Sequence, residues 1–580
     1  MPCVCTNNSQ CEEVFGSNYV CENEKCVETP QQNTFYVSVT GAGSHDGSLG
    51  NEMNLSEAKS YANINSDELI TFLLESGNYG DVVFSSSISR TSWAIWKANG
   101  DVNLSSIKIS NSLKRDGYLK FENLKINKED YRVNLIEIEK INYLIFEKVS
   151  IFNDKLEYHV PQDRAVIISD SDNILFDGCS LKGAFNSTTS TEKGIYSYDE
   201  SNNQNITIKN CDIQGYRKSI YMNGQNWIVE NNTIHNIPED GIVIGYCTNC
   251  TISNNKIYDL MPFNVERCLD SDSGTDCAHS DCLQANYVPS HNITIRNNLC
   301  YNGFTHGWWI NPLGATNYVI ENNMVFNATH VGNGGADTAT VCNINGIIFR
   351  NNLIEGKAKT HDGGLGCNRA TTYWRNFSYN IIRVLEVNSS GGVEYEDYNI
   401  FGYVLPWGGW KNPLGSHSKN FAGDYNSFYD IFVNASNNDF TPKWNSIACP
   451  GGNSNLSAGQ YIGALPCVCT NDQQCADLGL GDCDEASGKC SGLPSLSPFT
   501  QLLNFIKSLL TTKTGNAILA GKTINGNVIG NAVNETGNGN YKSSYIVLSI
   551  FVVIILIITV MIVKIKKNKK IKLKIKKKKR

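Results

Sequence analysis

Acid and base side chains gather in one stretch of the chain, which begins at Asp276 and reads DCAHSDCLQANYVPSHNITIRNNLCYNGFTHGWWIN. His279, Asp281 and His306 are residue types that transfer protons, and Asp240 lies one repeat earlier. Two carboxylates on adjacent strands repel each other, so one keeps its proton to a higher pH. Such a pair can supply the general acid and the general base that cleave a glycosidic bond, with His306 orienting or protonating the substrate.

The elements that must position these residues are copies of one repeat. NWIVENNTI, NCTISNNKI, NITIRNNLC and NYVIENNMV begin at Asn226, Asn249, Asn292 and Asn317. A base period of about 22 residues with insertions is typical of a parallel β-helix, whose coils each contribute short strands. Asn tolerates the left-handed backbone of a turn, and its amide can hydrogen-bond the same Asn one coil above. We therefore predict an all-β parallel β-helix over residues 34–465, with a short N-terminal capping helix that has Ser56 as its N-cap.

A second strand of each coil can be aligned across six copies. The copies are RAVIIS, KGIYSY, KSIYMN, DGIVIG, DCLQAN and HGWWIN, which begin at Arg164, Lys193, Lys218, Asp240, Asp281 and His306. The third residue of each copy, such as Trp308, should point into the core and the fourth outward. The fourth residues and those two positions further on include the predicted sugar-binding residues Tyr196, Tyr221, Gln284, Trp309, Asn286 and Asn311.

Aromatic rings stack on the C–H faces of sugars, and amides bond their hydroxyls, so these positions suit a glycan. Lys218 could neutralise a uronate. Two plainer interpretations stay open: an ordinary aromatic ladder on a sheet, and a solvated polar rim formed by Asp240, Asp281 and their neighbours.

Residues 34–465 resemble the pectin-lyase-like superfamily. YVSVTGAGSHDGSL, LSEAKSYA and ESGNYGDVVF are similar to the N-terminal cap of its secreted polysaccharide-active members, and PKWNSIA with YIGA resembles their usual end. The resemblance implies a right-handed parallel β-helix. It does not select an activity, because that fold hosts lyases, hydrolases, epimerases, tailspikes and adhesins.

Three runs also resemble the polygalacturonase-type hydrolases. PEDG, SDCLQ and THGWW take the places of Asn-Thr-Asp, Asp-Asp and Gly-His-Gly on consecutive coils. The resemblance implies that Asp240 and Asp281 are the acid and the base. Ser280 stands where an Asp is expected, however, and the next coil shows no Arg-x-Lys. A β-eliminating lyase that uses a Lys, Arg or His base and Ca²⁺ is therefore equally open.

An acidic insertion precedes Asp281. ERCLDSDSGTDC brings Asp270, Asp272 and Asp276 together, and clustered oxygen ligands of this kind suit Ca²⁺. Cys268 and Cys277 could close the insertion as a disulfide loop. The alternative is an acidic loop that is simply solvated.

Two cysteine-rich modules flank the β-helix, at residues 1–30 and 466–491. PCVCTNNSQC and PCVCTNDQQC are nearly the same, and each module holds five Cys. We predict small disulfide modules, with zinc knuckles as the alternative. Within the helix, Cys179 and Cys211 occupy equivalent positions of successive copies, either as a disulfide or as two buried thiols.

The C-terminal part carries a predicted membrane anchor. Residues 492–544 look like a flexible stalk, 545–563 are nineteen uncharged residues that could span a bilayer, and 564–580 form a basic tail placed in the cytoplasm. Removing the 12 basic residues of this tail leaves 37 basic against 56 acidic residues, a net charge of −19. The outer part is therefore a poor nucleic-acid binder.

The cysteines and several Asn-x-Ser/Thr sequons suit the cell surface. Met1 opens directly on the first module without an export signal, so we expect the true start to lie upstream. A tail-anchored cytosolic protein is the alternative. The sequence thus supports two classes of function: a membrane-anchored enzyme, lyase or glycoside hydrolase, that cleaves acidic polysaccharide, and an adhesin that only binds glycans.

Overall fold

The structure is a computed structural model that describes most of residues 33–465 and short pieces on either side. The described residues are 19–22, 25–28, 33–85, 89–127, 134–153, 164–183, 191–198, 202–260, 280–286, 288–303, 306–328, 337–359, 373–388, 392–407, 415–443, 446–449, 456, 461–465, 472, 483–484 and 489–490. Among these, no helix has both the length and the apolar character needed to cross a bilayer. The predicted anchor at 545–563, the stalk and the basic tail lie outside the described residues.

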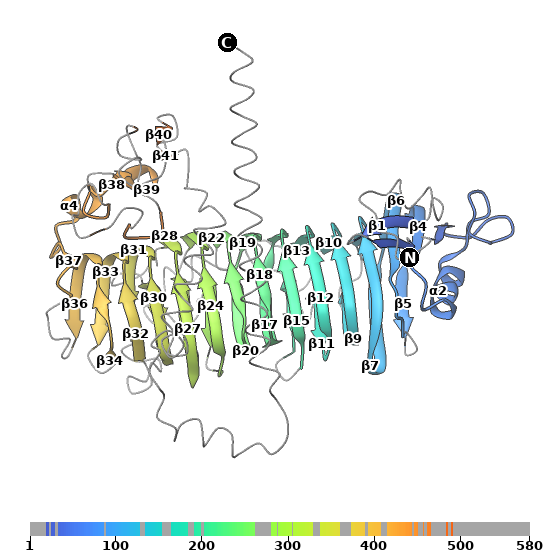
Figure 1. Ribbon diagram of the computed structural model, residues 1–580, viewed down its shortest axis with the longest axis horizontal. Helices are drawn as coiled ribbons and strands as arrows, with labels where there is room; N and C mark the ends of the chain where they lie inside the picture. The colour runs from blue at the N-terminus through green and yellow to red at the C-terminus, as the bar shows by residue number, and fades with distance from the viewer. Residues whose placement is uncertain are drawn as a thin grey trace, which may run out of the picture. The chain divides into compact units, whose positions relative to one another are not determined.

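Parallel strands stack coil upon coil, as the repeat predicts, and form three faces (Figure 1). The first face contains β5 (Asp81–Ser85), the first halves of β7 (Ser106–Glu122) and β9 (Ile136–Glu147), β11 (Arg164–Ser169), β14 (Thr191–Ser197), β17 (Tyr216–Gln225), β20 (Asp240–Thr248), β23 (Asp281–Asn286), β26 (His306–Asn311) and β29 (Asp337–Val341).

The second face contains β3 (Asn33–Val37), β4 (Ile70–Asn78), β6 (Ala94–Leu104), the later halves of β7 and β9, β12 (Asp172–Asp177), β15 (Gln204–Lys209), β18 (Ile228–Glu230), β21 (Thr251–Ser253), β24 (His291–Arg296), β27 (Ala315–Glu321), β30 (Ile344–Arg350), β32 (Tyr373–Ser378), β34 (Gly392–Val393) and β35 (Glu396–Asp397).

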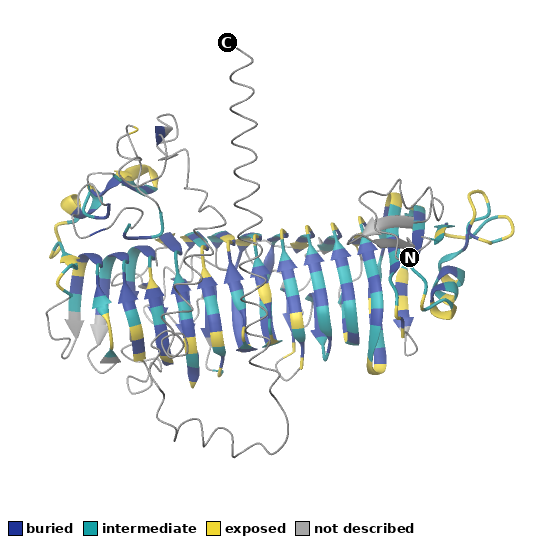
Figure 2. Cartoon of the chain, in the orientation of Figure 1, coloured by how far each residue is buried: buried dark blue, intermediate teal, exposed yellow. Residues whose placement is uncertain are grey.

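The third face contains β8 (Lys125–Asn127), β10 (Ser150–Asn153), β13 (Ser180–Gly183), β16 (Asp212–Gln214), β19 (Thr233–Ile237), β22 (Lys256–Leu260), β25 (Leu299–Gly303), β28 (Met324–Ala328), β31 (Leu353–Lys359), β33 (Ile381–Asn388), β36 (Ile400–Trp407) and β37 (Lys419–Asn420). β31 continues into the first face, because its later residues pair with β29. Burial alternates along the strands (Figure 2). The buried apolar residues of all three faces form one core.

A short helix begins the β-helix domain, but at a different cap from the predicted one. α2 (Leu55–Ile64) is capped by Asn54, whose side chain accepts a hydrogen bond from Glu57 N at 3.0 Å. Glu57 Oε2 in turn accepts from Asn54 N at 2.8 Å. The prediction of Ser56 as N-cap was wrong, because this reciprocal capping box starts the helix two residues earlier.

Three small antiparallel pairs complete the described structure. β1 (Tyr19–Glu22) pairs with β2 (Lys25–Glu28), and β40 (Cys483–Asp484) pairs with β41 (Lys489–Cys490). Both hairpins place two cysteine positions opposite each other, and Cys483 is disulfide-bonded. β38 (Phe432–Asn434) and β39 (Asp439–Pro442) form the third pair, which packs with α4 (Tyr425–Tyr429) and η2 (Ala435–Asn437) near the end of the β-helix.

A ladder of buried asparagines joins the coils between the second and third faces. Its members are Asn232, Asn255, Asn298, Asn323, Asn352, Asn380 and Asn399, all at most 2% exposed. Each side chain donates to the next side-chain oxygen at 2.9–3.2 Å, and that oxygen also accepts the backbone N–H of the donor residue. The residues before most of them have φ near +55°, which Asn adopts at low cost.

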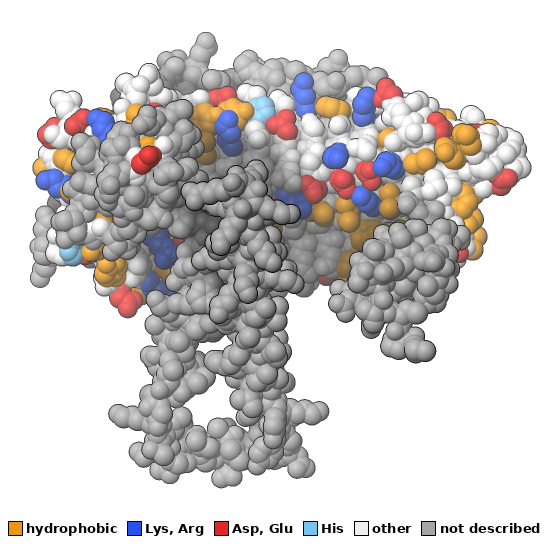
Figure 3. Space-filling view, turned by 45° about the horizontal axis from the view of Figure 1, so that its top comes forward, with side chains coloured by type: hydrophobic (Ala, Val, Ile, Leu, Met, Phe, Trp, Pro, Cys, Tyr) orange, Lys and Arg blue, Asp and Glu red, His pale blue; other side chains and the backbone are white. Residues whose placement is uncertain are grey.

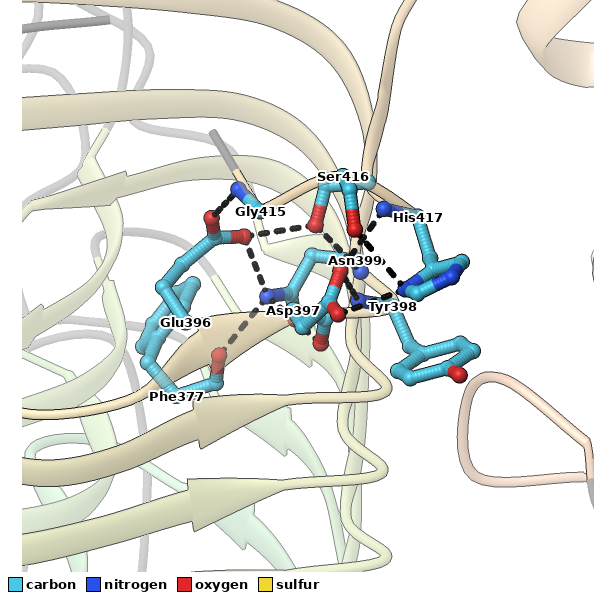
Figure 4. Close-up of polar contacts among 9 residues, drawn as sticks. Phe377, Glu396, Asp397, Tyr398, Asn399, Gly415, Ser416 and His417 are labelled. Carbon is cyan, nitrogen blue, oxygen red and sulfur yellow. Dashed lines mark hydrogen bonds and ion pairs between the residues drawn. The ribbon is translucent and has the colours of Figure 1, made fainter. Parts of the chain in front are cut away.

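The ladder has a different start and end. Cys211 occupies the preceding rung, where its backbone N–H donates to Asn232 Oδ1 at 2.9 Å. Cys179 and Cys211 are free buried thiols, so the structure selects thiols over the disulfide. The hydrogen bond with Cys179 and burial both raise the pKa of Cys211, which keeps that thiol protonated. At the other end, Asn399 donates to Glu396 Oε1 at 2.7 Å, as Figure 4 shows.

Replacing one buried ladder amide should destabilise the whole domain. Asn298→Ala removes the acceptor of Asn255 N and Nδ2 and the side-chain donor to Ile252 O, and it leaves Asn323 Oδ1 with only the backbone N–H of residue 298. We expect the free energy of unfolding in urea to fall by about 2–4 kcal/mol. Asn292→Gly is the matched control. Asn292 is exposed, and its Nδ2 donates to Asn249 Oδ1 of the neighbouring coil at 3.0 Å; Gly removes this amide but keeps the positive φ, so the change should cost less than about 1 kcal/mol. Equal losses in the two variants would contradict a special role for the buried ladder.

Candidate functional site

The six aligned strands stack in the register that the sequence predicts. Arg164, Lys193, Lys218, Asp240, Asp281 and His306 pair in succession, and we call this line of first residues the rim row. Successive residues of the row lie on neighbouring rungs, about 4.8 Å apart. The third residues of the strands, Trp308 among them, lie in the core. The chain therefore places three basic residues, two acidic residues and a histidine in one line.

Asp240 is a buried carboxyl with unmet hydrogen-bonding capacity. Its residue is 0% exposed, and neither carboxyl oxygen accepts a hydrogen bond of good geometry from the described residues. Lys218 Nζ lies 3.2 Å from Asp240 Oδ2 and 3.0 Å from Glu239 Oε1. Arg217 also pairs with Glu239. Three charged side chains therefore surround Asp240 from the preceding residue and the preceding rung.

The surroundings of Asp240 favour the protonated form of its carboxyl. Burial raises the pKa of Asp240, and the negative charges of Asp281 and Glu239 raise it further. The positive charge of Lys218 lowers this pKa only in part, so it lies well above its ordinary value of 3.8. Burial lowers the pKa of Lys218, but Asp240 and Glu239 outweigh it, so that this pKa lies above its ordinary value and the ammonium stays charged. The arrangement therefore places a carboxyl that favours its protonated form beside the Lys218 ammonium.

Asp281 completes the pair on the next rung. Its side chain is 0% exposed, and Gln284 Nε2 donates to Asp281 Oδ2 at 3.4 Å. Gln284 is 5% exposed, and its Oε1 accepts no hydrogen bond from the described residues. The plain interpretation of a solvated polar rim is wrong for Asp240 and Asp281, because solvent reaches neither carboxyl.

The predicted aromatic positions are buried against cations. Tyr196 is 6% exposed, and its ring centroid lies 3.9 Å from Lys193 Nζ and 4.5 Å from Arg164 Cζ. Tyr221 is half-buried with its ring 5.3 Å from that of Tyr196, and Trp309 is 5% exposed. Arg164 and Lys193 already lie over the Tyr196 ring and make cation–π contacts with it, so this ring does not present an open face to a sugar.

The remaining predicted residues divide between buried and undescribed positions. Asn311 is 0% exposed and accepts a hydrogen bond from Asn343 Nδ2 at 2.5 Å, so it lies inside the coil rather than on the outer ladder. The backbones of Asn286 and His306 are placed, but not their side chains. His279, Asp270, Asp272 and Asp276 lie outside the described residues, as do Cys268 and Cys277. In the described part of the chain, no group of three His, Cys, Asp or Glu residues could hold a metal ion.

The sequence analysis missed a second ion pair on the same face. Lys357 Nζ lies 3.3 Å from Glu386 Oε2, and both side chains are largely buried. Lys357 pairs in register with Asp337 of β29. The coil after His306 contributes β29 to the first face, and Lys357 of β31 lies one coil further on. The basic residue is therefore one coil beyond the position where the polygalacturonase pattern has its Arg-x-Lys. The sequence GKAK after an apolar strand was the available signal.

Two other polar groupings lack the geometry for catalysis. Ser416 Oγ and Asp397 Oδ2 both contact His417 Nδ1, at 3.2 and 2.7 Å (Figure 4). A nucleophilic triad needs the serine and the carboxylate on opposite ring nitrogens, so these three residues instead close the end of the β-helix.

A hollow of about 390 Å³ on the second face includes Glu321 and Arg350, which pair with each other at 2.7 Å.

A disulfide braces the strand that carries Asp281. Cys282 follows Asp281 directly, and it is bonded to Cys300 of β25 across 18 residues of sequence. Cys247 and Cys250 form a second disulfide between β20 and β21. The Cys282–Cys300 bond fixes the first face to the third at the coil of the candidate site.

Removing the Cys282–Cys300 bond should destabilise the domain. Replacing both residues by Ala should lower the free energy of unfolding by about 3 kcal/mol, as expected for a loop of this size. The matched control replaces Cys179 and Cys211, two buried sulfurs that form no disulfide. A reductant should destabilise the wild type and this control alike, but change the Cys282/Cys300 variant less. An identical response in all three proteins would contradict the role of this bond.

Comparisons with known proteins agree with the fold. A family model for a right-handed β-helix region matches residues 134–261 and 218–382. No curated protein sequence matches the chain. Similar solved structures include a GH136 lacto-N-biosidase from Eubacterium ramulus (13% identity, 67% of each chain, TM-score 0.36) and the pectate lyase Pel9A (12% identity, 70% of this chain and 84% of that one, TM-score 0.34). Another is PfbA, a surface adhesin of Streptococcus pneumoniae (12% identity, 64% and 89%, TM-score 0.31).

Proposed function

We propose that the chain, which contains a right-handed β-helix region, is a polysaccharide-active enzyme whose active site is the Asp240–Asp281 pair. The reaction is general acid/base cleavage of a glycosidic bond. Asp240 donates a proton to the leaving oxygen, and Asp281 acts as the base or stabilises the positive charge that develops on the sugar.

The observation that carries this proposal is the state of Asp240. Asp240 is fully buried, and neither carboxyl oxygen accepts a well-aligned hydrogen bond from the described residues, although the Lys218 ammonium lies 3.2 Å from Oδ2. A ligand could complete the hydrogen bonding of this carboxyl. The raised pKa of Asp240 keeps a transferable proton on it, while Asp281 lies on the adjacent rung. Gln284 Oε1 offers a further unused acceptor beside Asp281. A sugar hydroxyl or glycosidic oxygen would satisfy these groups once neighbouring side chains move to admit it, because neither carboxyl is exposed in the free protein.

Hydrolysis suits the described residues better than β-elimination. An eliminating lyase needs a base that is neutral at the working pH. Lys218 is not such a base, because Asp240 and Glu239 raise its pKa and hold its ammonium at 3.2 and 3.0 Å. The same contacts oppose the predicted role of Lys218 in neutralising a uronate. His279 and His306 remain the bases through which elimination would have to proceed.

Calcium stays a separate proposal. Asp270, Asp272 and Asp276 have the oxygen ligands that Ca²⁺ prefers, and no step of the reaction above depends on the ion. If bound there, Ca²⁺ would order the insertion next to Asp281 or contact an acidic substrate group. Addition of EGTA to the assays described next distinguishes a calcium-dependent activity from an independent one.

The catalytic roles of the two aspartates are testable on a panel of polysaccharides. Asp240→Asn and Asp281→Asn should each lower the release of reducing ends by about 10²–10⁴-fold, because each removes one half of the acid/base pair. Activity of the wild type should fall as the pH rises through the raised pKa of Asp240, since the carboxyl then loses its proton. Asp101→Asn, which changes an exposed aspartate of β6, should retain activity.

Product analysis separates the reaction classes. Hydrolysis gives reducing ends without ultraviolet absorbance, whereas elimination gives unsaturated products that absorb. Cleavage that survives both aspartate substitutions, or absorbing products that depend on His306 alone, would show that the assignment is wrong.

The second candidate function is glycan binding without cleavage. It is favoured by the complete burial of Asp240 and Asp281, because a carboxyl closed to solvent can serve the fold alone. An adhesin of this kind would bind polysaccharide in the wild type and in Asp240→Asn equally, and no panel member would be cleaved.

We also propose that the protein acts at the cell surface, anchored by residues 545–563 with the tail 564–580 in the cytoplasm. The disulfides at Cys247–Cys250 and Cys282–Cys300 support an oxidising exterior. A membrane-impermeant amine reagent should label lysines of the β-helix on intact cells but not those of the tail. Labelling that requires lysis would place the β-helix inside the cell.

A further inference from the structure

A column of stacked rings lies at the turn between the second and third faces, near the end of the β-helix. Tyr379 stacks on Tyr398 with ring centroids 4.9 Å apart and planes 4° from parallel, and Tyr398 stacks on His417 at 4.5 Å and 8° (Figure 4 labels the last two). On the two preceding coils, Asn351 and Asn322 occupy the same turn position and share the positive φ of the tyrosines. The column therefore ends at Tyr379, and the second face of this ring is turned toward the shorter Asn351.

The hollow of about 390 Å³ lies where this column ends. Tyr379 is part of its wall, together with Tyr395, which is 43% exposed, and the amides of Asn322 and Asn351. The C-terminal segment holds the backbone of Tyr379, because Gly463 N donates to Tyr379 O at 2.8 Å. The volume falls within the range of small-molecule sites, about 300–1,000 Å³. The hollow thus occupies the rungs on which a further ring of the column would lie.

The polar lining of the hollow offers acceptors and donors side by side. Arg350 Nε and Nη2 lie 2.8 and 2.7 Å from one oxygen of Glu321, Oε2, and Oε1 has no partner among the described residues. Ser378 Oγ donates to Asn376 Oδ1 at 2.5 Å, which leaves the Nδ2 group of Asn376 as a donor. Neighbouring sugar hydroxyls use such a mixture of groups. Because Arg350 and Glu321 cancel each other's charge, this lining favours an uncharged ligand over an ion.

We propose that the hollow is a second saccharide site, which binds one neutral pyranose ring of a glycan on the second face. The C–H face of the sugar stacks on Tyr379 and continues the column, while its hydroxyls bond Glu321 Oε1 and Asn376 Nδ2. The site is separate from the Asp240–Asp281 pair, which lies on the first face. It holds a glycan without cleaving it, and it stands whether or not the chain is an enzyme.

Calorimetric titration of the full chain tests this site with oligosaccharides of equal length: a galactan, a mannan and a glucan, with an oligogalacturonate as the charged comparison. Asp240→Asn is the parent in all samples, so that the proposed reaction consumes no probe. Tyr379→Asn should weaken binding of the neutral probe that fits by roughly tenfold, because it removes the ring but keeps a residue that adopts positive φ at low cost. Tyr379→Phe should bind as the parent does, because the ring remains.

Tyr143→Asn is the matched control. Tyr143 also has a positive φ, 61°, and stacks on the ring of Tyr118 at 4.5 Å and 8°, but it does not line this hollow. This variant should bind the neutral probe as the parent does. Asn376→Asp, which replaces the Nδ2 donor by an acceptor, should weaken binding as Tyr379→Asn does.

The outcomes separate this site from the proposed activity. Binding of no neutral probe, equal losses in Tyr379→Asn and Tyr143→Asn, or stronger Tyr379-dependent binding of the oligogalacturonate would overturn the site. A glycan attached to Asn376, which begins an Asn-Phe-Ser sequon, would overturn it too, because that sugar would fill the hollow. If the wild type cleaves nothing but Tyr379-dependent binding remains, the activity fails while this site stands.

Discussion

The stacking of one coil on the next at a fixed spacing is the constraint on which the rest of the structure depends. Backbone hydrogen bonds between parallel strands set that spacing, and the buried asparagine ladder holds it at the turn between the second and third faces. Each amide satisfies its neighbour, so the turn needs no water and no other side chain. Insertions of different lengths can leave the stack between these turns without disturbing its register.

This constraint forces residues of like position into contact. In the rim row, side chains that would avoid each other in a free chain are held on adjacent rungs, about 4.8 Å apart. Lys218 reduces the repulsion between the carboxylates of Glu239 and Asp240, because its ammonium pairs with both. The repulsion between Asp240 and Asp281 instead raises the pKa of Asp240, which favours the protonated form of that carboxyl. The chemistry proposed for the site is thus a consequence of stacking.

Charge is interspersed over the described surface, with both signs on neighbouring rungs, as Figure 3 shows for one side of the molecule. Pairs such as Lys97 with Glu122 and Lys120 with Glu147 repeat this pattern on the second face. Arg164 instead lies against the rings of Tyr196 and Tyr198.

The sequence by itself determined the period of the coil and the register of the first face, because the repeated Asn and the alternation of apolar residues leave only one stacking. It therefore placed Asp240 next to Asp281 and Trp308 in the core. Only the tertiary structure decided how far each side chain is buried and what it contacts. Asp240 is closed to solvent, and the Tyr196 ring is covered by cations, because neighbouring rungs supply those contacts. A pattern along one chain fixes which residues are neighbours, but the electrostatics among them depends on side-chain positions in three dimensions.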